Sequence, residues 1–381
     1  MNQKSDPKST AEAVPIQGFE KAVTNYEASK TWVPVSDRVI RVGIAGYGVC
    51  NFGAAFHFQD HPNVTVAAVA ELDPDKRAEL ARACRCATAY SSCEELIEDD
   101  SLEAVFVATD APSHARLAIA ALKAGKHVAS AVPAVWGSLE DADALFAAAK
   151  TADRSYMMFE TSYFHEDLYN MRELYQSGAL GKVLYAEGEY WHYFPTPLAA
   201  HESWRTGSPP QWYPTHSNAY YMGVTGGSFT EVSCMGVPSS VDHLKAANNR
   251  YGNPFGTEIA LFRTSDGGMA RMGVSWDTPG VGGETGRIRT EKGTFYGAFQ
   301  HDGREPGPAT FKRPPLPPGV DAGGHGGSHG YLMCEFVEAI LLDRTPLIDV
   351  AQALNMTVSG IVAHESALKD GVLLKIPQYT L

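Results

Sequence analysis

Histidine and tyrosine side chains that can exchange protons with an alcohol gather in two stretches of the second half of the sequence. The run WYPTHSN holds Tyr213 and His216, and the run EGEYWHY holds Tyr190 and His192. Imidazole has an unperturbed pKa of about 6.5, so it is suited to take a hydroxyl proton while a hydride leaves the same carbon. We predict catalytic roles for these four side chains, with His216 as the first choice of base.

Each of these side chains also has a structural interpretation. A histidine whose nitrogens are satisfied by backbone groups would explain His216 without catalysis. Residues two apart on a strand point to the same face, so Tyr190 and His192 could instead form part of a subunit interface. Tyr213 would transfer a proton only if a neighbouring cation lowers the pKa of its phenol.

Three further side chains are predicted to bind substrate, namely Glu160, Arg205 and His325. Glu160 ends the apolar run SYMMFE, at the carboxyl end of a predicted strand, which is where open α/β sheets place ligands. It could hold a hydroxyl of the substrate, orient a histidine or form an ordinary salt bridge. These three possibilities stay open at the level of the sequence.

His325 lies in the glycine-rich run GGHGGSHG, four residues before His329. The spacing H-x-x-x-H is compatible with a metal site only where a helix places both imidazoles on one side, and the glycines do not favour such a helix. We therefore predict no metal and interpret the run as a flexible lid that touches the substrate or cofactor.

A dinucleotide site is predicted at an apolar run, Val39 to Ala45, which leads into a glycine-rich turn and an expected helix. Gly46 allows a tight turn, and Gly48 lets backbone amides approach a pyrophosphate at the N-terminus of that helix. Asn51 occupies the place of the third glycine of G-x-G-x-x-G. The predicted cofactor-binding residues are Gly46, Gly48, Val49, Cys50, Asn51, Glu71, Thr109, His114, Val132 and Pro133.

The choice between NAD and NADP depends on Glu71, which ends a second apolar strand, Val64 to Ala70. A carboxylate at this place can bind both ribose hydroxyls, and its charge repels a 2′-phosphate. We therefore predict NAD as the cofactor.

Apolar strands and helical segments alternate up to about residue 160, which predicts an α/β Rossmann domain with a doubly wound parallel sheet. Aromatic strands separated by Gly/Pro-rich loops follow, and they indicate an α+β domain with a mostly antiparallel sheet. The expected divisions are an N-terminal arm over residues 1–38, the dinucleotide-binding domain over 39–158, and a substrate-binding and oligomerisation domain over 159–381.

Composition narrows the class of protein further. The net charge of −13 argues against nucleic acid or an anionic membrane as the main partner, and no apolar run approaches the ~20 residues that a membrane span needs. The first 38 residues have no apolar core of the kind that a signal peptide requires, so a cytoplasmic location is expected. The stretch from Trp32 to Val35 could pack on its own domain or on a neighbouring subunit, or belong to a partly disordered leader.

From residue 39 to its end, the sequence resembles the Gfo/Idh/MocA family of nicotinamide-dependent sugar and cyclitol oxidoreductases. The matching features are the Gly46 loop, the run ELDPDKR from Glu71, His114 before a helix, and the run AGKHV that leads to Pro133. The resemblance implies a Rossmann domain followed by an open-faced, mostly antiparallel sheet that often mediates dimers or tetramers. It also implies a small carbohydrate substrate bound between the two domains.

One position departs from this family pattern. The family normally carries Glu-Lys-Pro where this chain has Ala131, Val132 and Pro133, so the usual catalytic lysine is replaced by Val132. Valine cannot transfer a proton, so either another side chain is the base or the protein is not a simple dehydrogenase. A cofactor-binding protein without catalytic activity is a further interpretation.

A narrower likeness concerns NAD-dependent glycoside hydrolases of the same superfamily, typified by bacterial α-N-acetylgalactosaminidases, which also lack the lysine. The shared runs are VPA, YMMFE, EGEYWH, YPTH and GHGG. The likeness implies that tyrosine and histidine motifs line the sugar site, and that a sugar hydroxyl is oxidised before elimination, water addition and re-reduction. Because the chain departs at Tyr193, Phe194 and Ser217, an NAD-dependent sugar oxidoreductase is the first expectation and the redox-neutral hydrolase is the second.

Overall fold

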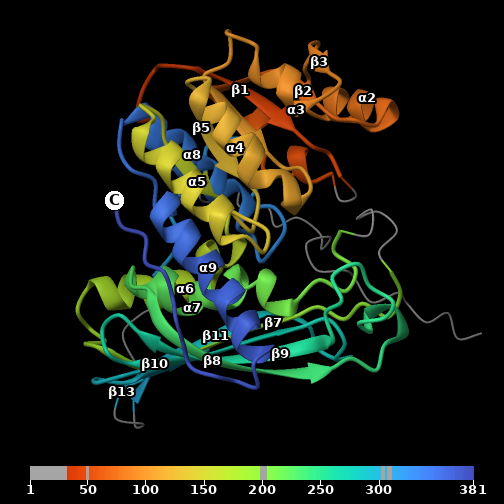
Figure 1. The fold of residues 1–381 in the computed structure, drawn as a ribbon. Helices are drawn as coiled ribbons and strands as arrows, with labels where there is room; N and C mark the ends of the chain where they lie inside the picture. The colour runs from red at the N-terminus through yellow and green to blue at the C-terminus, as the bar shows by residue number, and fades with distance from the viewer. Residues whose placement is uncertain (1–31, 49–50, 198–203, 302–304, 307–310) are drawn as a thin grey trace, which may run out of the picture.

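The computed structural model describes residues 32–48, 51–197, 204–301, 305–306 and 311–381. Two sheets organise these residues, and Figure 1 shows the larger one at the bottom of the molecule and the smaller one at the top. The predicted sites at Val49 and Cys50 lie outside the described residues, as do residues 1–31 of the expected arm. Trp32 is described, and its ring meets that of His61 edge-on at 6.0 Å, so this residue packs on its own domain.

The first sheet is parallel and has six strands in the order β3-β2-β1-β4-β5-β6, which confirms the predicted Rossmann domain. Its strands are buried apolar runs because helices cover both faces. The strands are β1 (Ile40–Ala45), β2 (Val64–Ala70), β3 (Ala89–Tyr90), β4 (Ala104–Val107), β5 (His127–Ser130) and β6 (Tyr156–Met158). The helices between them are α2 (Pro74–Ala83), α3 (Cys93–Ile97), α4 (His114–Lys123) and α5 (Leu139–Thr151).

Local sequence explains where these helices begin. Asp73 accepts hydrogen bonds from the backbone amides of Asp75 and Lys76, and Pro74 occupies the first turn of α2. Ser138 caps α5 in the same way, through the amide of Asp141. The expected helix after the glycine turn is wrong, since only two short 3-10 turns follow, η1 (Phe52–Ala54) and η2 (Phe58–Asp60).

The physical reason is the backbone at the residues that precede the two turns. Asn51 has a φ of 56° and His57 a φ of 63°. Both angles belong to the left-handed region, which a right-handed helix cannot include. The chain therefore changes direction twice where a longer helix is expected.

The second sheet has nine strands in the order β14-β13-β12-β11-β7-β10-β9-β8-β15. Only β7 and β10 pair in parallel, so the predicted mostly antiparallel sheet is confirmed. Its strands are β7 (Val183–Trp191), β8 (Phe229–Pro238), β9 (Phe255–Thr264), β10 (Met269–Ser275), β11 (Gly283–Thr290), β12 (Thr294–Tyr296), β13 (Ala298–His301), β14 (Glu305–Pro306) and β15 (Leu374–Lys375).

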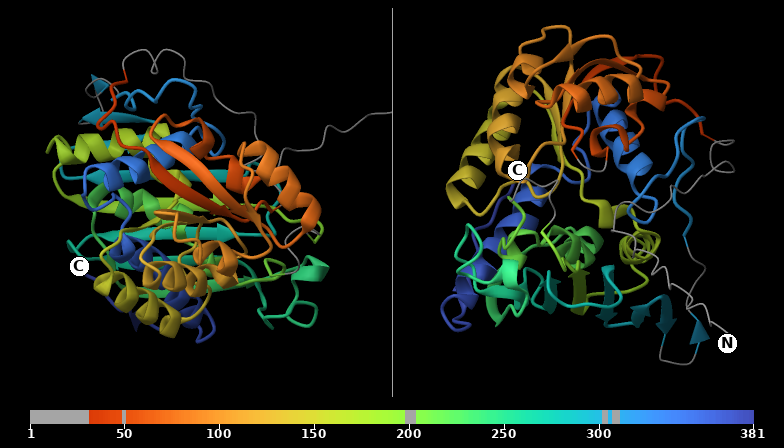
Figure 2. Two further views of the ribbon diagram at one scale, coloured as in Figure 1. Left: turned by 90° about the horizontal axis from the view of Figure 1, so that it is seen from above. Right: turned by 90° about the vertical axis from the view of Figure 1, so that its right-hand side faces the viewer.

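Helices α6 (Glu166–Gln176), α7 (Thr215–Thr225) and α9 (Val350–Ala367) lie between this sheet and the Rossmann domain (Figures 1 and 2). Sequence reasoning missed α6 and α7. All ten residues from Thr215 to Val224 are buried, so α7 lacks the polar stripe that identifies a surface helix. The opposite face of the sheet carries exposed side chains, as an open-faced sheet does.

Two late segments connect the halves of the molecule. The amide of Met158, at the end of β6, donates to the carbonyl of Ile348, which precedes α9. Helix α8 (His329–Leu341) returns to the Rossmann domain, where Phe336 packs edge-on against Phe58 and Phe159. Within the described part of the chain, none of the helices combines the length and apolar character that a membrane crossing requires.

Candidate functional site

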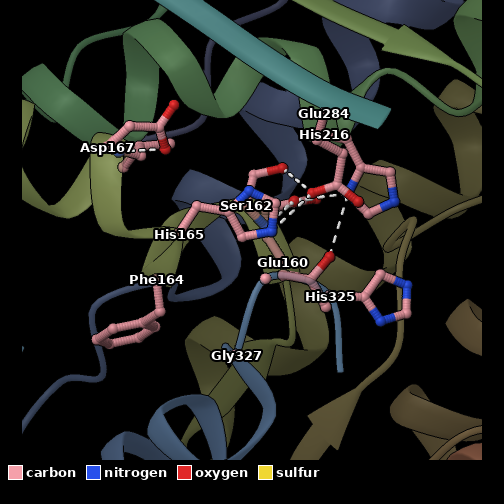
Figure 3. Close-up of polar contacts among 12 residues, drawn as sticks. Glu160, Ser162, Phe164, His165, Asp167, His216, Glu284, His325 and Gly327 are labelled. Carbon is pink, nitrogen blue, oxygen red and sulfur yellow. Dashed lines mark hydrogen bonds and ion pairs between the residues drawn. The ribbon is translucent and has the colours of Figure 1, made fainter. Parts of the chain in front are cut away.

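A buried histidine–glutamate pair joins the two halves of the molecule. His216 comes from the first turn of α7, and Glu160 begins the turn that follows β6, η4 (Thr161–Phe164). His216 Nδ1 lies 2.7 Å from Glu160 Oε1, and the two residues are 3% and 0% exposed (Figure 3). The Ser162 amide also donates to Glu160 Oε1, at 2.9 Å. The contact with His216 orients the histidine and is also an ion pair, whereas binding of a sugar hydroxyl by Glu160 stays a prediction.

Glu284, on β11, is a second buried carboxylate beside this pair. Its Oε1 lies 3.7 Å from His216 Nδ1, and its Oε2 lies 3.3 Å from His165 Nε2. The hydroxyl of Ser162 donates to Glu284 Oε2. Burial raises the pKa of Glu284, but the charges of His216, His165 and His325 outweigh burial and lower that pKa to about 2.

These carboxylates determine the protonation of His216. Burial disfavours the charged imidazolium, but the charges of Glu160 and Glu284 and the hydrogen bond that His216 donates to Glu160 outweigh burial, so the pKa of His216 is raised above its usual value. The carboxylate accepts from Nδ1, which therefore carries a proton. Nε2 is then the nitrogen of His216 that gains and loses a proton. We call Glu160, His216 and Glu284 the His216 cluster.

The His216 cluster also has the composition of a cation site, since one ligand atom from each residue lies within 4.8 Å of the other two. The 2.7 Å contact between His216 and Glu160 has the length of a charge-assisted hydrogen bond. We therefore interpret the cluster as an ion pair and retain the prediction of no metal.

The other predicted catalytic residues lie next to His216. The ring centroid of Tyr190 is 4.6 Å from that of His216, and its hydroxyl is 3.0 Å from His192 Nδ1. This contact confirms that Tyr190 and His192 share a face. Arg205 donates to the Tyr190 hydroxyl at 2.8 Å and lies over the ring of Tyr213, 4.3 Å from its centroid. The predicted residues thus converge on one place.

Arg205 is the cation beside Tyr213, but its charge does not bring the pKa of the Tyr213 phenol below the usual value. Burial raises the pKa of the Tyr213 phenol, and Arg205 lowers it only in part, so the net shift is upward. Burial likewise raises the pKa of Tyr190 to about 12, with Arg205 again opposing it. Both phenols are therefore protonated at neutral pH, and the condition for proton transfer by Tyr213, a pKa lowered by a neighbouring cation, is not met.

His325 stacks over His216 with ring centroids 6.5 Å apart, so the glycine-rich run lies against the cluster. His325 Nδ1 is 2.8 Å from His329 Nε2. This distance places a hydrogen bond between the two nitrogens, and they are therefore not ligands of one ion. His329 is the first residue of α8, and His325 belongs to the preceding turn.

The glycine loop of the Rossmann domain has the shape of a nucleotide cradle. Gly46 has a φ of +98°, and a Cβ there would come within 2.3 Å of the Ala108 carbonyl oxygen. A Cβ at Gly53 would meet the Gly46 carbonyl oxygen at 2.1 Å. Gly48 is open, because no atom lies within 4 Å of its Cβ position. The backbone here can be approached closely by a ligand, so the residues fit a dinucleotide.

Glu71 lies at this loop, as its position after β2 predicts. Its Oε2 accepts from the amide of Tyr47 at 2.8 Å and from that of Gly48 at 3.5 Å. Its other oxygen accepts from the amide of Asp73 at 3.2 Å. The carboxylate is thus fixed beside the turn that would hold the pyrophosphate of a dinucleotide.

The remaining predicted cofactor residues lie at the carboxyl ends of β4 and β5. His114 Nδ1 is 2.8 Å from the carbonyl oxygen of Pro133, and its Nε2 is 3.2 Å from that of Thr109. Burial lowers the pKa of His114, and a neutral ring donates to only one of these two oxygens. Val132, the residue before Pro133, is buried.

Sequence reasoning missed Glu284, Ser162 and His165. Ser162 and Glu284 are 122 residues apart in the chain, and Glu284 lies in the unremarkable run GETGRIRT. An acidic residue on a strand can be recognised as buried, and so as a candidate site residue, only once the pairing of that strand is known. His165, by contrast, follows Glu160 by five positions and could have been weighed with it.

The sequence is similar to that of known proteins. Residues 40–160 match the Gfo/Idh/MocA family, described as "Oxidoreductase family, NAD-binding Rossmann fold". A "Glycosyl hydrolase family 109 protein" of Saccharopolyspora erythraea is 25% identical, over 96% of this chain and 87% of that protein. The "Glycosyl hydrolase family 109 protein 1" of Bacteroides fragilis is 29% identical over 40% of this chain and 35% of that protein. The match thus spans about a third of that relative's length.

Solved structures extend the likeness in fold to both sheets. Levoglucosan dehydrogenase in complex with NADH and levoglucosan superposes with a TM-score of 0.74 at 20% identity, covering 90% of this chain and 100% of that one. Scyllo-inositol dehydrogenase from Lactobacillus casei, with NAD(H) and scyllo-inositol, gives 0.69 at 16% identity, covering 89% and 99%. Residues 40–160 of this chain are thus similar to the NAD-binding Rossmann domain of the Gfo/Idh/MocA oxidoreductase family.

Proposed function

We propose that this protein uses NAD to oxidise a hydroxyl group of a sugar or glycoside. The observation that carries the proposal is the buried His216–Glu160 pair, 2.7 Å apart at the carboxyl edge of the NAD-binding sheet. Open α/β sheets bind their ligands at this edge. Substrate would lie against His216, and the glycine loop with Glu71 would hold the dinucleotide.

The proposed chemistry is a hydride transfer coupled to a proton transfer. NAD, when bound, supplies the hydride acceptor. His216 takes the hydroxyl proton on Nε2, and the carboxylates of Glu160 and Glu284 stabilise the imidazolium that forms. This pair supplies the proton transfer that Val132, in the place of the family's lysine, cannot supply.

A buried oxygen of Glu160 that lacks a hydrogen-bond donor among the described residues also supports binding of a polyol. Within the described part of the chain, no donor lies within hydrogen-bonding distance of Glu160 Oε2, although this oxygen is buried. An unsatisfied buried carboxylate oxygen costs about 1–3 kcal/mol. A sugar hydroxyl would remove this cost, and Arg205 would offer a positive charge to the same ligand from the other side of Tyr190.

A redox-neutral glycoside hydrolase is the second candidate, and one observation favours it. Elimination from a keto sugar needs a second group that removes the proton beside the carbonyl. The Tyr190 hydroxyl, 3.0 Å from His192 Nδ1 and 2.8 Å from Arg205, is a second proton-exchanging unit beside His216. The relatives named for glycosyl hydrolase family 109 motivate the same test.

The test is incubation of the NAD-loaded protein with a cleavable glycoside in deuterated water. An oxidoreductase accumulates NADH and a keto sugar, and the glycosidic bond stays intact. A hydrolase releases the aglycone without net NADH, and its product carries deuterium at the carbon beside the oxidised one. A protein that binds NAD but gives neither product with a broad set of sugars and glycosides would be a non-catalytic cofactor binder, and the proposal would fail.

We propose further that the protein works as a homodimer or homotetramer in the cytoplasm. The open face of the second sheet exposes Met235 and Val237 on β8 and Leu261 on β9, by 69%, 56% and 47%. Arg271, Glu187 and Arg287 continue the same face as an ion-paired row across β10, β7 and β11. Apolar and paired charged side chains together suit a second copy of the same face.

A further inference from the structure

Two histidines of the glycine-rich run form a hydrogen-bonded chain to which the proposed reaction assigns no role. His325 Nδ1 lies 2.8 Å from His329 Nε2, and His329 Nδ1 lies 3.1 Å from the carbonyl oxygen of Ala55. Ala55 directly follows η1, behind the glycine loop, and the ring of its neighbour Phe56 stacks on His329 at 4.2 Å. His325 stacks over His216. The chain thus runs from the Rossmann backbone to the His216 cluster.

The direction of the hydrogen bonds is fixed by Ala55, because a carbonyl oxygen only accepts. His329 Nδ1 therefore carries a proton. Burial, together with the positive charges of His325, His57 and His165, holds the pKa of His329 well below its usual value, although the bond to Ala55 opposes this. The His329 ring is therefore neutral, and its Nε2 is an acceptor. The donor in the bond between the two histidines is Nδ1 of His325.

We propose that His329 is a positioning residue that holds His325 in the tautomer with its proton on Nδ1, so that Nε2 of His325 is the nitrogen that exchanges a proton in the substrate site. That the substrate is a carbohydrate rests on the proposed function, whereas the tautomer rests on the hydrogen bonds alone. His325 then acts as a second acid–base group opposite His216, and His329 acts only through it.

The loop is built to keep the His325 ring in place. His325 has a φ of 48°, and the next two residues, Gly326 and Gly327, have φ values of 63° and 74°. A Cβ at Gly326 would lie 2.8 Å from the ring of His165, so this turn packs directly against the partner of Glu284. The charge of His325 contributes to the lowered pKa of Glu284. A proton on His325 Nε2 is therefore felt at the His216 cluster.

The direct test is magnetic resonance of the full-length protein with isotope-labelled histidine rings. The resonances of His325 are identified by their loss in His325→Asn. We expect a protonated Nδ1 and an unprotonated Nε2 in His325 at a pH where the ring is neutral. The opposite tautomer, or an equal mixture of the two, would overturn the proposal.

Two variants separate positioning from packing. His329→Phe keeps the stack on Phe56 but removes the acceptor, so we expect His325 to lose its single tautomer. His329→Gln offers one donor and one acceptor, as a neutral imidazole does, and should restore the Nδ1–H form. A His325 tautomer unchanged in His329→Phe would contradict the proposal. His61→Phe, at another buried histidine near the amino ends of the strands, controls for the general cost of such a change and should leave His325 unaltered.

The turnover rates of the His329 variants give a second measurement of the role of His329. We expect His329→Phe to lower kcat with little change in NAD affinity, by up to the ~10²- to 10⁴-fold that general acid–base catalysis contributes, and His329→Gln to recover part of it. We also expect the pH–rate profile of His329→Phe to lose the limb that belongs to His325. A kcat and a profile equal to those of the unchanged protein would refute the role of His329. If no carbohydrate is oxidised at all, the proposed function fails, and the tautomer measurement still decides this inference.

Discussion

At the scale of single residues, the site is organised by two carboxylates that face one imidazole. A base whose pKa is raised is protonated over more of the physiological range, and it holds its proton more tightly once it has taken it. The carboxylates of Glu160 and Glu284 therefore favour proton removal from an alcohol, whose own pKa is far higher. In the proposed reaction, they would let His216 act as the base although Val132 cannot.

The pH dependence of turnover tests this electrostatic account. Oxidation requires neutral His216, so kcat/KM should rise with pH through a pKa above the usual value for histidine. Glu284→Gln removes a negative charge that raises the pKa of His216. The pKa should then fall, and the rising limb of the profile should move to lower pH. A limb that stays in place or moves to higher pH in Glu284→Gln would contradict the assignment.

Selectivity for the cofactor also depends on one residue. The carboxylate of Glu71, held by the amides of Tyr47 and Asp73, repels a 2′-phosphate. We expect calorimetric titration to give tighter binding of NAD than of NADP, and Glu71→Ala to narrow the difference. Equal or stronger binding of NADP by the unchanged protein would disprove the role of this charge.

At the scale of elements, the glycine turn between β1 and η1 determines whether the cofactor is held. Gly46→Ala should abolish NAD binding and destabilise the fold, because its Cβ would lie 2.3 Å from a backbone oxygen that cannot move aside. Gly125→Ala is the matched control, since Gly125 has a φ of +72° and no atom within 4 Å of its Cβ position. Gly125→Ala should lower the free energy of unfolding by only ~1–2 kcal/mol, which is the cost of placing alanine in the left-handed backbone region.

Thermal unfolding and NAD titration of both variants measure the difference. The expected result is normal NAD affinity in Gly125→Ala and none in Gly46→Ala. Similar behaviour of the two variants would mean that the left-handed backbone alone, and not the close approach to Ala108, requires glycine at this turn.

Sequence patterns predict strands and helices whose buried side chains recur with a regular period. They fail where an element is buried on all sides, or where its contacts are with residues far away in the sequence. The parallel strands are short apolar runs, and β7 alternates clearly enough to place Tyr190 beside His192. Helix α7, which carries His216, is buried on every side, so no amphipathic period marks it. The glycine turn predicts a helix, but left-handed residues at Asn51 and His57 replace it with two short turns.

The candidate site was predictable to the extent that its residues occur in recognisable runs. His216, Tyr190, His192, Arg205 and Glu160 fall together as the sequence suggests. Glu284 does not belong to such a run, since only the pairing of β11 with β7 brings it beside residues from far earlier in the chain. The hydrogen-bonded chain from His325 through His329 likewise depends on the carbonyl oxygen of Ala55 in the Rossmann domain. No spacing in the sequence reveals this acceptor.

At the scale of the whole molecule, the open sheet face predicts assembly. We expect light scattering after size-exclusion chromatography to give a dimer or tetramer. Leu261→Lys places a charge among exposed apolar side chains and should shift the protein toward the monomer, whereas Leu72→Lys, at an exposed residue of the Rossmann domain, should not. A protein that is monomeric before any change would remove the proposed role of this face.

The proposed reaction needs both domains, because NAD would be held by the Rossmann loop and the proposed base, His216, comes from α7. If this account is right, His216 should be needed for the hydride step and not for holding the cofactor. Removing a general base typically costs about 10²- to 10⁴-fold in rate. His364→Ala serves as control, since His364 forms an equally buried pair with Glu258, 2.6 Å long, outside the proposed site.

The most direct measurement is rapid mixing of the NAD-loaded protein with a panel of sugars and glycosides, followed by the absorbance of reduced nicotinamide in a single turnover. We predict reduced nicotinamide with at least one substrate, a rate lowered about 10²- to 10⁴-fold in His216→Ala at unchanged NAD affinity, and a rate close to normal in His364→Ala. Reduction by His216→Ala at the rate of the unchanged protein, or no reduction with any substrate, would contradict the central claim.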